Sequence, residues 1–272
     1  MAQNAVSTNL PKATDAALTT RVRLRYLEQG DVWGSPVLFL HGLTDSSFSF
    51  MPLLPYLPAS MRAIAPDQRG HGVSDRPRAG YAPQDFARDA LALMDSLGIE
   101  RATFVGHSMG TFVAREAALA APDRVAALML IAPGATGRGP GLRELWQAVE
   151  TMVDPVDPAF VREFQAGTIH RPLTPEFLNK VVEESLKVPA RVWRAALWQL
   201  VAIDSAERAR AIGCPTHILW GDQDSTFLRG EQDELSRIIS DATLEVLHGV
   251  GHAVHWEAPE FVAQRLRRLT RA

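Results

Sequence analysis

Two kinds of hydrophobic pattern alternate along the chain. Residues 22–27 alternate apolar and polar side chains with the period of two that is typical of a half-exposed strand. Further short, strand-like apolar runs lie at residues 37–40, 62–65, 102–105, 127–131, 217–220 and 244–247. Segments with helical spacing separate them, at residues 83–97, 109–121, 230–239 and 259–269. Strands that alternate with helices of this length predict an α/β fold with a mostly parallel sheet and helices on both faces.

Residues 134–208 break this alternation. The segment begins with a glycine-rich stretch at residues 134–141, and it contains helical patterns but no clear strand. We therefore expect an all-helical insertion between two strands of a core formed by residues 21–133 and 209–272. The insertion is either extra packing on the core or a lid over a site, and its glycine-rich start favours a lid. Residues 1–20 are polar, and we expect a loose N-terminal tail there.

Composition narrows the classes of function only modestly. A chain of 272 residues with 28 basic and 31 acidic side chains has a net charge of −3, which does not point to nucleic acid or to a membrane surface as a partner. A single cysteine, Cys214, excludes an intramolecular disulfide, and we expect a buried thiol. The start of the chain lacks a secretory signal pattern, and no apolar stretch approaches the roughly 18 residues of a membrane span. We expect a cytoplasmic protein that acts on a small molecule, with its oligomeric state open.

The pentapeptide Gly106-His107-Ser108-Met109-Gly110 follows a strand-like run and opens a helix-like segment. This is the setting in which G-x-S-x-G forms a nucleophile elbow, a sharp turn that exposes the serine hydroxyl above the sheet. Small residues at both ends of the motif let the strand and the helix approach each other closely. A glycine-rich turn with a non-catalytic serine would have the same sequence pattern. The motif therefore indicates a nucleophile only if a base and an acid occur elsewhere in the chain.

Those partners follow later strands. A serine hydroxyl needs a base to become nucleophilic, and the base needs an acid to orient it. In open α/β sheets, site residues lie at the carboxyl ends of strands. Asp222 and Asp224 follow the run at residues 217–220, and His252 follows the run at residues 244–247. The chain order is therefore Ser108, an aspartate and His252, which is the order of the α/β-hydrolase arrangement.

With these elements in order, the chain resembles the α/β-hydrolase superfamily, and within it the capped, single-domain branch of esterase-like serine hydrolases. The matching stretches cover roughly residues 21–272 and lie at His41-Gly42-Leu43, at residues 67–74, 106–110 and 220–224, and at residues 251–260. The resemblance implies an eight-stranded sheet with a helical cap inserted after the sixth strand. It also implies that Ser108 is the nucleophile, that His252 is the general base and then the acid, and that Asp224 rather than Asp222 is the orienting acid.

The resemblance further assigns the residues around the nucleophile. The backbone N–H groups of Leu43 and Met109 become the expected oxyanion-hole donors. His41 becomes a residue that shapes its loop, and Asp67 and Arg69 become loop-stabilising residues. Because His107 precedes the nucleophile on the strand, we expect its side chain to point away from the serine.

A serine at the elbow argues against haloalkane dehalogenases and epoxide hydrolases, which use an aspartate there. It implies an acyl-enzyme and hence carboxylic esters, with lactones, thioesters and amides left open. The sequence contains no metal-ligand cluster or phosphate-binding loop, so we expect no cofactor. Phe48, Trp198 and Phe227 are the candidate pocket walls, and an apolar pocket would suit uncharged acyl groups of short to medium length or an aromatic moiety.

Three other functions share this triad. Ring-cleavage C–C hydrolases usually carry a Gly-x-Gly-Pro oxyanion loop and a tryptophan after the histidine. This chain instead has a loop at residues 41–45 that begins with His41, and it has Ala253 after the histidine. Cofactor-free haloperoxidases and perhydrolases form the same acyl-serine. Some relatives keep the triad but serve as ligand receptors with little turnover.

Overall fold

The structure is a computed structural model that describes residues 10–203 and 205–270. The described residues form one eight-stranded sheet in the order β1-β2-β4-β3-β5-β6-β7-β8. The pairs β1/β2 and β2/β4 are antiparallel, and all the other neighbouring pairs are parallel. The strands are β1 Lys12–Ala17, β2 Arg23–Gln29, β3 Ser35–Leu40, β4 Met61–Pro66, β5 Ala102–His107, β6 Val125–Ile131, β7 Thr216–Gly221 and β8 Ala242–Leu247.

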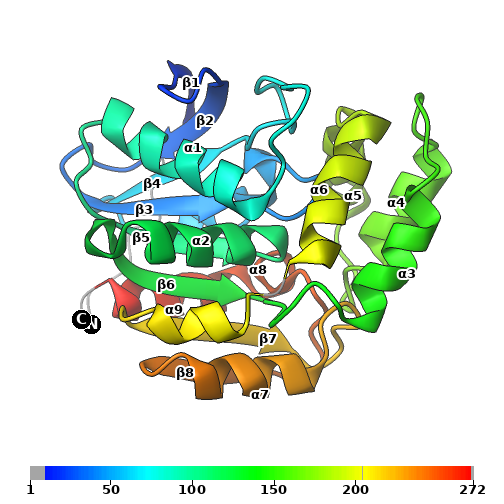
Figure 1. The fold of residues 1–272 in the computed structure, drawn as a ribbon. Coiled ribbons are helices and arrows are strands. Elements are labelled where there is room, and N and C mark those ends of the chain that lie inside the picture. The colour runs from blue at the N-terminus through cyan, green and yellow to red at the C-terminus, as the bar shows by residue number, and fades with distance from the viewer. Residues whose placement is uncertain (1–9, 204, 271–272) are drawn as a thin grey trace.

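Helices cover both faces of this sheet (Figure 1). Those of the α/β core are α1 Pro83–Ser96, α2 Met109–Ala120, α7 Arg229–Ile238, α8 Val254–Glu257 and α9 Pro259–Leu269. Four short 3-10 helices accompany them, at η1 Ser47–Phe50, η2 Leu54–Tyr56, η3 Pro122–Arg124 and η4 Glu207–Ala211. The predicted α/β fold with a mostly parallel sheet is confirmed.

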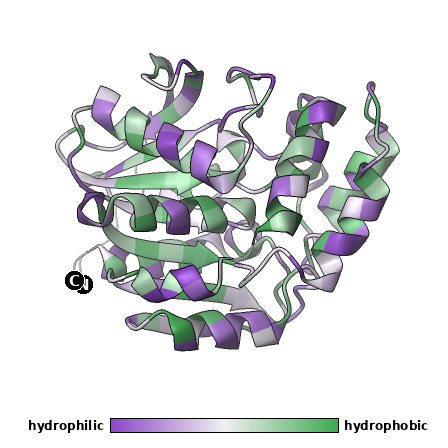
Figure 2. Cartoon of the chain, viewed as in Figure 1, coloured by the Kyte–Doolittle hydropathy of each residue, from purple (hydrophilic) through white to green (hydrophobic). Residues whose placement is uncertain are grey.

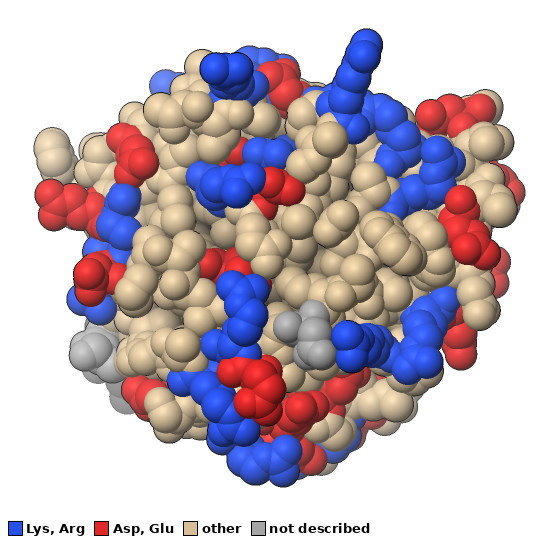
Figure 3. All heavy atoms as spheres, in the orientation of Figure 1, with Lys and Arg blue, Asp and Glu red and all other residues tan. Residues whose placement is uncertain are grey.

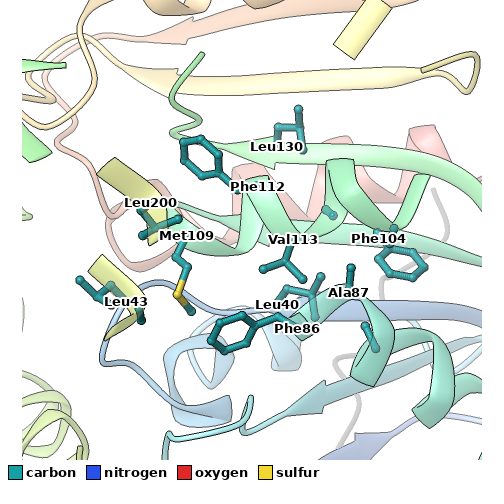
Figure 4. Close-up of a cluster of buried hydrophobic side chains, with 14 of the residues drawn as sticks. Leu40, Leu43, Phe86, Ala87, Phe104, Met109, Phe112, Val113, Leu130 and Leu200 are labelled. Atoms are coloured by element: carbon teal, nitrogen blue, oxygen red, sulfur yellow. The ribbon is translucent and has the colours of Figure 1, made fainter. Parts of the chain in front are cut away.

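The strands alternate their side chains between two apolar cores. Along β3, Leu38 and Leu40 join the core under α1, α2 and α7, whereas Val37 and Phe39 join the core under α9. Both faces of the central strands are thus apolar, as Figure 2 shows for the middle of the sheet. Part of the larger core is drawn in Figure 4, which labels Leu40, Leu43, Phe86, Ala87, Phe104, Met109, Phe112, Val113, Leu130 and Leu200.

Among the described residues, four α-helices lie between β6 and β7, and we call them, with the loops that join them, the helical insertion: α3 Pro140–Val149, α4 Pro158–Ala166, α5 Pro175–Leu186 and α6 Ala190–Ala202. They lie at the side of the molecule toward which the arrows of β3, β5 and β6 point (Figure 1). The inward positions of α6 are apolar and fully buried, and they include Trp193, Leu197 and Leu200. The helical insertion therefore packs over the carboxyl ends of the strands.

The N-terminal segment differs from our prediction. Residues 12–17 do not form a loose tail, because they pair with β2 as the antiparallel edge strand β1. Asp15 on this strand accepts a hydrogen bond from Arg25 on β2. The strand is mostly exposed and polar, so it lacks the apolar alternation by which strands are recognised. The rest of the predicted tail up to residue 9 lies outside the described residues.

Candidate active site

Ser108 lies at a strained turn between β5 and α2. Its backbone has φ 50° and ψ −115°, in a region that residues with a side chain rarely adopt. The turn also requires close backbone contacts, because a Cβ atom at Gly110 would lie 2.0 Å from the Leu40 carbonyl oxygen, and one at Gly106 would lie 2.3 Å from that of Gly110. This is the backbone geometry of a nucleophile elbow, and it explains why the motif needs glycine on both sides.

Asp224 and His252 meet where β7 and β8 end. The Nδ1 atom of His252 is 2.8 Å from Oδ2 of Asp224, and both side chains are almost completely buried. The other carboxylate oxygen of Asp224 accepts hydrogen bonds from the backbone N–H groups of Thr226 and Phe227. These bonds fix the carboxylate, which in turn fixes the orientation of the imidazole ring.

Asp222 has a different partner. Its Oδ2 atom is 2.8 Å from Nδ1 of His248, and its Oδ1 atom accepts a hydrogen bond from the backbone N–H of Gly249. The hydrogen bond from His248 and those from Gln223 and Gly249 lower the pKa of Asp222 to about 2. His248 is largely exposed. The structure thus pairs His252 with Asp224 and not with Asp222.

One cavity is bordered by five of the predicted site residues. It has a volume of about 40 Å³ and is bordered by Ser108, His252, Leu43, Met109 and Phe227. The helical insertion supplies part of its wall through Leu142 and Leu145 of α3, Phe164 and Gln165 of α4, Thr168, and Leu200 of α6. Figure 4 shows Leu43, Met109 and Leu200 close to one another at this end of the core. The cavity is thus largely apolar, with polar atoms at a few points.

Two of the three predicted pocket walls are wrong. Phe48 stacks on Phe177 of α5, with ring centroids 5.4 Å apart, and does not border the cavity. Trp198 is 50% exposed and packs against Trp146, because it lies on the outward face of α6. Phe227 does border the cavity, and its ring centroid lies 5.7 Å from that of His252.

The two expected oxyanion donors lie on separate elements, and both residues border the cavity that contains Ser108. Met109 is the first residue of α2, and the N–H groups of a helix's first turn have no partner within the helix. Leu43 precedes Thr44, whose positive φ of 67° marks a second strained turn. His41 shapes this loop, since its Nε2 atom accepts a hydrogen bond from the backbone N–H of Gln68, and burial lowers its pKa to about 4.

Two further histidines are buried around His252. His107 contacts the His252 carbonyl oxygen through Nε2 at 3.3 Å, and its ring centroid lies 4.3 Å from that of His255. Burial, and then the neighbouring His255 and His252, lower the pKa of His107 well below its usual value. Burial also lowers the pKa of His255 to about 3. Both rings are therefore neutral at ordinary pH.

The helical insertion is tied directly to the loop that carries His252. The backbone N–H of Ala253 donates to the Thr168 carbonyl oxygen at 2.9 Å. Glu257 accepts from the backbone N–H groups of His170, Arg171 and Gly251. These contacts hold one wall of the cavity against the loop that carries His252.

Two of the polar residues that border the cavity without having been predicted, Asp45 and Gln165, contact each other. Asp45 lies at the end of the loop at residues 41–45, and Gln165 lies on α4, a helix that we did not predict separately. They touch across 120 positions of the chain, with Gln165 Nε2 donating to Asp45 Oδ1 at 3.1 Å. To predict this contact, the sequence would have to show that α4 packs over the loop at residues 41–45.

Among the described residues, no helix combines the length and the apolar character needed to cross a membrane. The same residues contain no group of three or more His, Cys, Asp or Glu side chains placed to hold a metal ion.

Comparison with known proteins identifies the family. The model of the α/β-hydrolase fold family matches residues 35–259, so the chain belongs to that family. It is 28% identical to a 2-(acetamidomethylene)succinate hydrolase from Mesorhizobium japonicum over 90% of this chain and 91% of that protein. A thermophilic esterase from Thermogutta terrifontis superimposes with a TM-score of 0.84 at 27% identity, covering 96% of this chain and 98% of the esterase. An esterase from Exiguobacterium antarcticum shares the fold with a TM-score of 0.87 at 20% identity, covering 96% and 100% of the two chains. The protein is a hydrolase of this family.

Proposed function

We propose that the protein is a serine hydrolase that cleaves carboxylic esters through an acyl-enzyme on Ser108. One observation carries this proposal: Ser108 at its strained turn and His252, held by Asp224, border the same small, largely apolar cavity. A nucleophile, a base and an orienting acid are the three parts that acyl transfer needs. The likeness to a bacterial esterase at 27% identity supports the choice of esters.

The chemistry follows from these roles. His252 Nε2 takes the proton of Ser108 Oγ while Oγ attacks the ester carbonyl carbon. The backbone N–H groups of Leu43 and Met109 stabilise the negative charge that develops on the carbonyl oxygen. The proton then passes from His252 to the alcohol oxygen, the C–O bond breaks, and the acyl group stays on Ser108. A water molecule repeats the two steps, which releases the acid and restores the serine.

The helical insertion acts as the cap of this site in the proposal. Its helices α3, α4 and α6 border the cavity, so they shape the space next to Ser108 and exclude water from it. With a cavity volume of about 40 Å³, the acyl group next to the serine is short.

The test is the hydrolysis of p-nitrophenyl esters from acetate to decanoate. We expect an optimum at the short end of the series, and a loss of roughly 10³-fold or more in Ser108→Ala. Ser236→Ala removes an exposed hydroxyl on α7 and should leave the profile as it is. A stoichiometric burst without turnover, or no reaction in a folded protein, would contradict the proposal and favour a ligand receptor or a C–C bond hydrolase.

A further inference from the structure

A buried carboxylate borders the cavity without a cationic partner. Asp45 is 4% exposed, and its Oδ1 atom accepts a hydrogen bond from Gln165 at 3.1 Å. Its Oδ2 atom accepts from Ser49 Oγ at 3.3 Å and lies 3.8 Å from Nδ1 of His107. Both hydrogen-bond donors are neutral, and the His107 ring is neutral as well. At hydrogen-bond distance, a negative charge on Asp45 therefore meets only neutral donor groups.

The charge is present under ordinary conditions. Burial raises the pKa of Asp45 to about 6, and the hydrogen bonds from Gln165 and Ser49 and the proximity of His252 oppose that rise. Above pH 7 the carboxylate is thus mainly ionised, inside a cavity whose other walls are mostly apolar.

An open groove of about 390 Å³ adjoins the cavity. The two share Leu145, Phe164, Thr168 and Thr226 as lining residues. The groove also contains Glu144 of α3 and Glu163 of α4, both exposed. The groove next to the cavity therefore carries two acidic side chains, and the cavity itself carries a third, Asp45.

The described lining of the cavity and the groove offers these groups no positive side chain. Among the described residues that border the cavity and the groove, none is Lys or Arg. The nearest basic residues on the same two helices are engaged elsewhere: Arg143 donates to the Arg138 carbonyl oxygen, and Arg162 donates to Asn179. On the face drawn in Figure 3, by contrast, basic and acidic side chains are interspersed. The presence of acidic residues without basic ones is therefore a feature of the cavity and the groove.

The physical consequence concerns the charge of the substrate. A carboxylate on the substrate would lose its hydration in the cavity, and it would find a like charge there instead of a cation. At short distance and low dielectric this repulsion is strong. A methyl group meets no such penalty, and an ammonium group would supply the missing counter-charge of Asp45.

We propose that the site selects esters by charge, accepting neutral and cationic acyl groups and excluding those that carry a carboxylate, and that Asp45 is the residue that sets this selectivity. The proposal rests on the proposed ester hydrolysis, and it adds the chemical class of substrate. The exposed glutamates at the groove contribute less than Asp45, because water and salt screen them.

Three methyl esters of closely matched chain length test the proposal at pH 7.5. Methyl butyrate is neutral, β-alanine methyl ester places an ammonium where butyrate has its methyl group, and monomethyl succinate places a carboxylate there. We expect kcat/KM, followed by methanol release, to be at least about 30-fold lower for the succinate ester than for the butyrate ester, since like charges in a desolvated site repel strongly. The β-alanine ester should react at least as well as the butyrate ester.

Variants locate the effect. In Asp45→Asn the ratio between the butyrate and succinate esters should fall below about 5-fold, because the amide removes the charge and keeps the shape. The ratio is the readout, so a general loss of activity leaves the test valid. In Glu144→Gln at the groove the ratio should change by less than about twofold. An unchanged ratio in Asp45→Asn would overturn the role of Asp45, and equal rates of the wild-type protein on the butyrate and succinate esters would overturn the selectivity.

A binding measurement separates this proposal from the proposed function. Propylboronic acid and 2-carboxyethylboronic acid probe the same site without turnover, and the wild-type protein should bind the carboxylate form at least about 30-fold more weakly. This comparison needs no variant, so it decides the selectivity even if Asp45→Asn does not fold. Failure to hydrolyse methyl butyrate would contradict the ester hydrolase, whereas equal binding of the two boronic acids would contradict only the charge selectivity.

Discussion

Two Asp–His pairs lie where β7 and β8 end, and they share one hydrogen-bond length but not one environment. Both the Asp224–His252 contact and the Asp222–His248 contact measure 2.8 Å. The side chains of the first pair are 0% and 5% exposed, whereas those of the second are 28% and 88% exposed. Distance alone would therefore assign both pairs the same role. Burial and neighbours separate them, because only the first pair includes a histidine, His252, that borders the cavity with Ser108.

The difference has a physical cause. An exposed Asp–His pair is screened by water, and its side chains can rearrange at little cost. The buried pair is held on several sides, by backbone N–H groups on Asp224 and by the Phe227 ring beside His252. A base held in one orientation is what general-base catalysis requires. Each prediction below compares the two pairs or changes what surrounds the buried one.

The largest effect is expected from the histidines. His252→Ala should lower kcat for the best p-nitrophenyl ester by roughly 10³- to 10⁶-fold, because the serine loses its base. His248→Ala is the matched control and should change kcat by less than about twofold, since its ring is exposed and outside the cavity. Steady-state kinetics on the two purified variants measures both values. A similar loss in both variants would contradict the assignment of the base.

The aspartates should give a smaller effect of the same kind. Asp224→Asn keeps the size of the side chain but no longer favours the orientation and charge state of His252, so kcat should fall by roughly 10²- to 10⁴-fold. Asp222→Asn should retain at least about half of the activity, because its partner is the exposed His248. If Asp222→Asn were the more damaging change, the pairing seen in the structure would not be the catalytic one.

Replacing Phe227, the aromatic residue beside the buried pair, should lower activity less than replacing either member of that pair. Phe227 is fully buried between Phe112 and His252. Phe227→Leu leaves space beside the imidazole, and we expect a drop of about 10-fold in kcat/KM together with a shift of the optimum toward longer acyl chains. Trp198→Leu, on the outer face of α6, should leave the chain-length profile unchanged. Identical profiles for the wild-type protein and Phe227→Leu would show that this ring does not shape the pocket.

The buried pair also shows what sequence reasoning could reach. The expected strands and core helices are found because buried strands carry continuous apolar runs and core helices carry a clear apolar face. Ser108, Asp224 and His252 each follow such a strand, so the topology places them at one edge of the sheet. The edge strand β1 was missed because it is exposed and polar.

Side-chain direction was harder to predict than position. Phe48 and Trp198 were chosen as pocket walls for being aromatic, but aromatic character does not say which face of a helix or loop meets the cavity. Asp45 and Gln165 were missed for a different reason. Their contact joins a core loop to the helical insertion, and the packing of the insertion on the core is set by many contacts that no local pattern records.

The smallest effect in this series is a change with pH in the stability of the folded protein. It depends on Asp45, whose carboxylate lies 3.8 Å from Nδ1 of His107. Asp45 and Asp222 shift in opposite directions, because burial raises the pKa of Asp45 to about 6 while hydrogen bonds from His248, Gln223 and Gly249 lower that of Asp222 to about 2. A carboxyl whose pKa is raised on folding contributes stability at low pH, and this contribution is lost as the pH rises through its folded value. Ionisation of Asp45 should therefore destabilise the protein between about pH 4 and pH 7, by on the order of 2 kcal/mol.

The difference in melting temperature between Asp45→Asn and the wild-type protein isolates this contribution. It should move in favour of the variant by a few degrees, about 4 to 8 °C, between pH 4 and pH 7, because the variant has no carboxyl to ionise at this position. The change with pH is the readout, since the amide alters the hydrogen bonds with Gln165 and Ser49 equally at every pH. Asp222→Asn is the control: Asp222 titrates below this window in the folded protein and stabilises it when ionised, so any drift in its difference should be small and run in the opposite direction. If the difference in melting temperature between Asp45→Asn and the wild-type protein did not change with pH, the Asp45 carboxylate would be better compensated than its neutral neighbours imply. That result would weaken the contrast between the buried carboxylates of the site and the exposed Asp222–His248 pair, which water solvates.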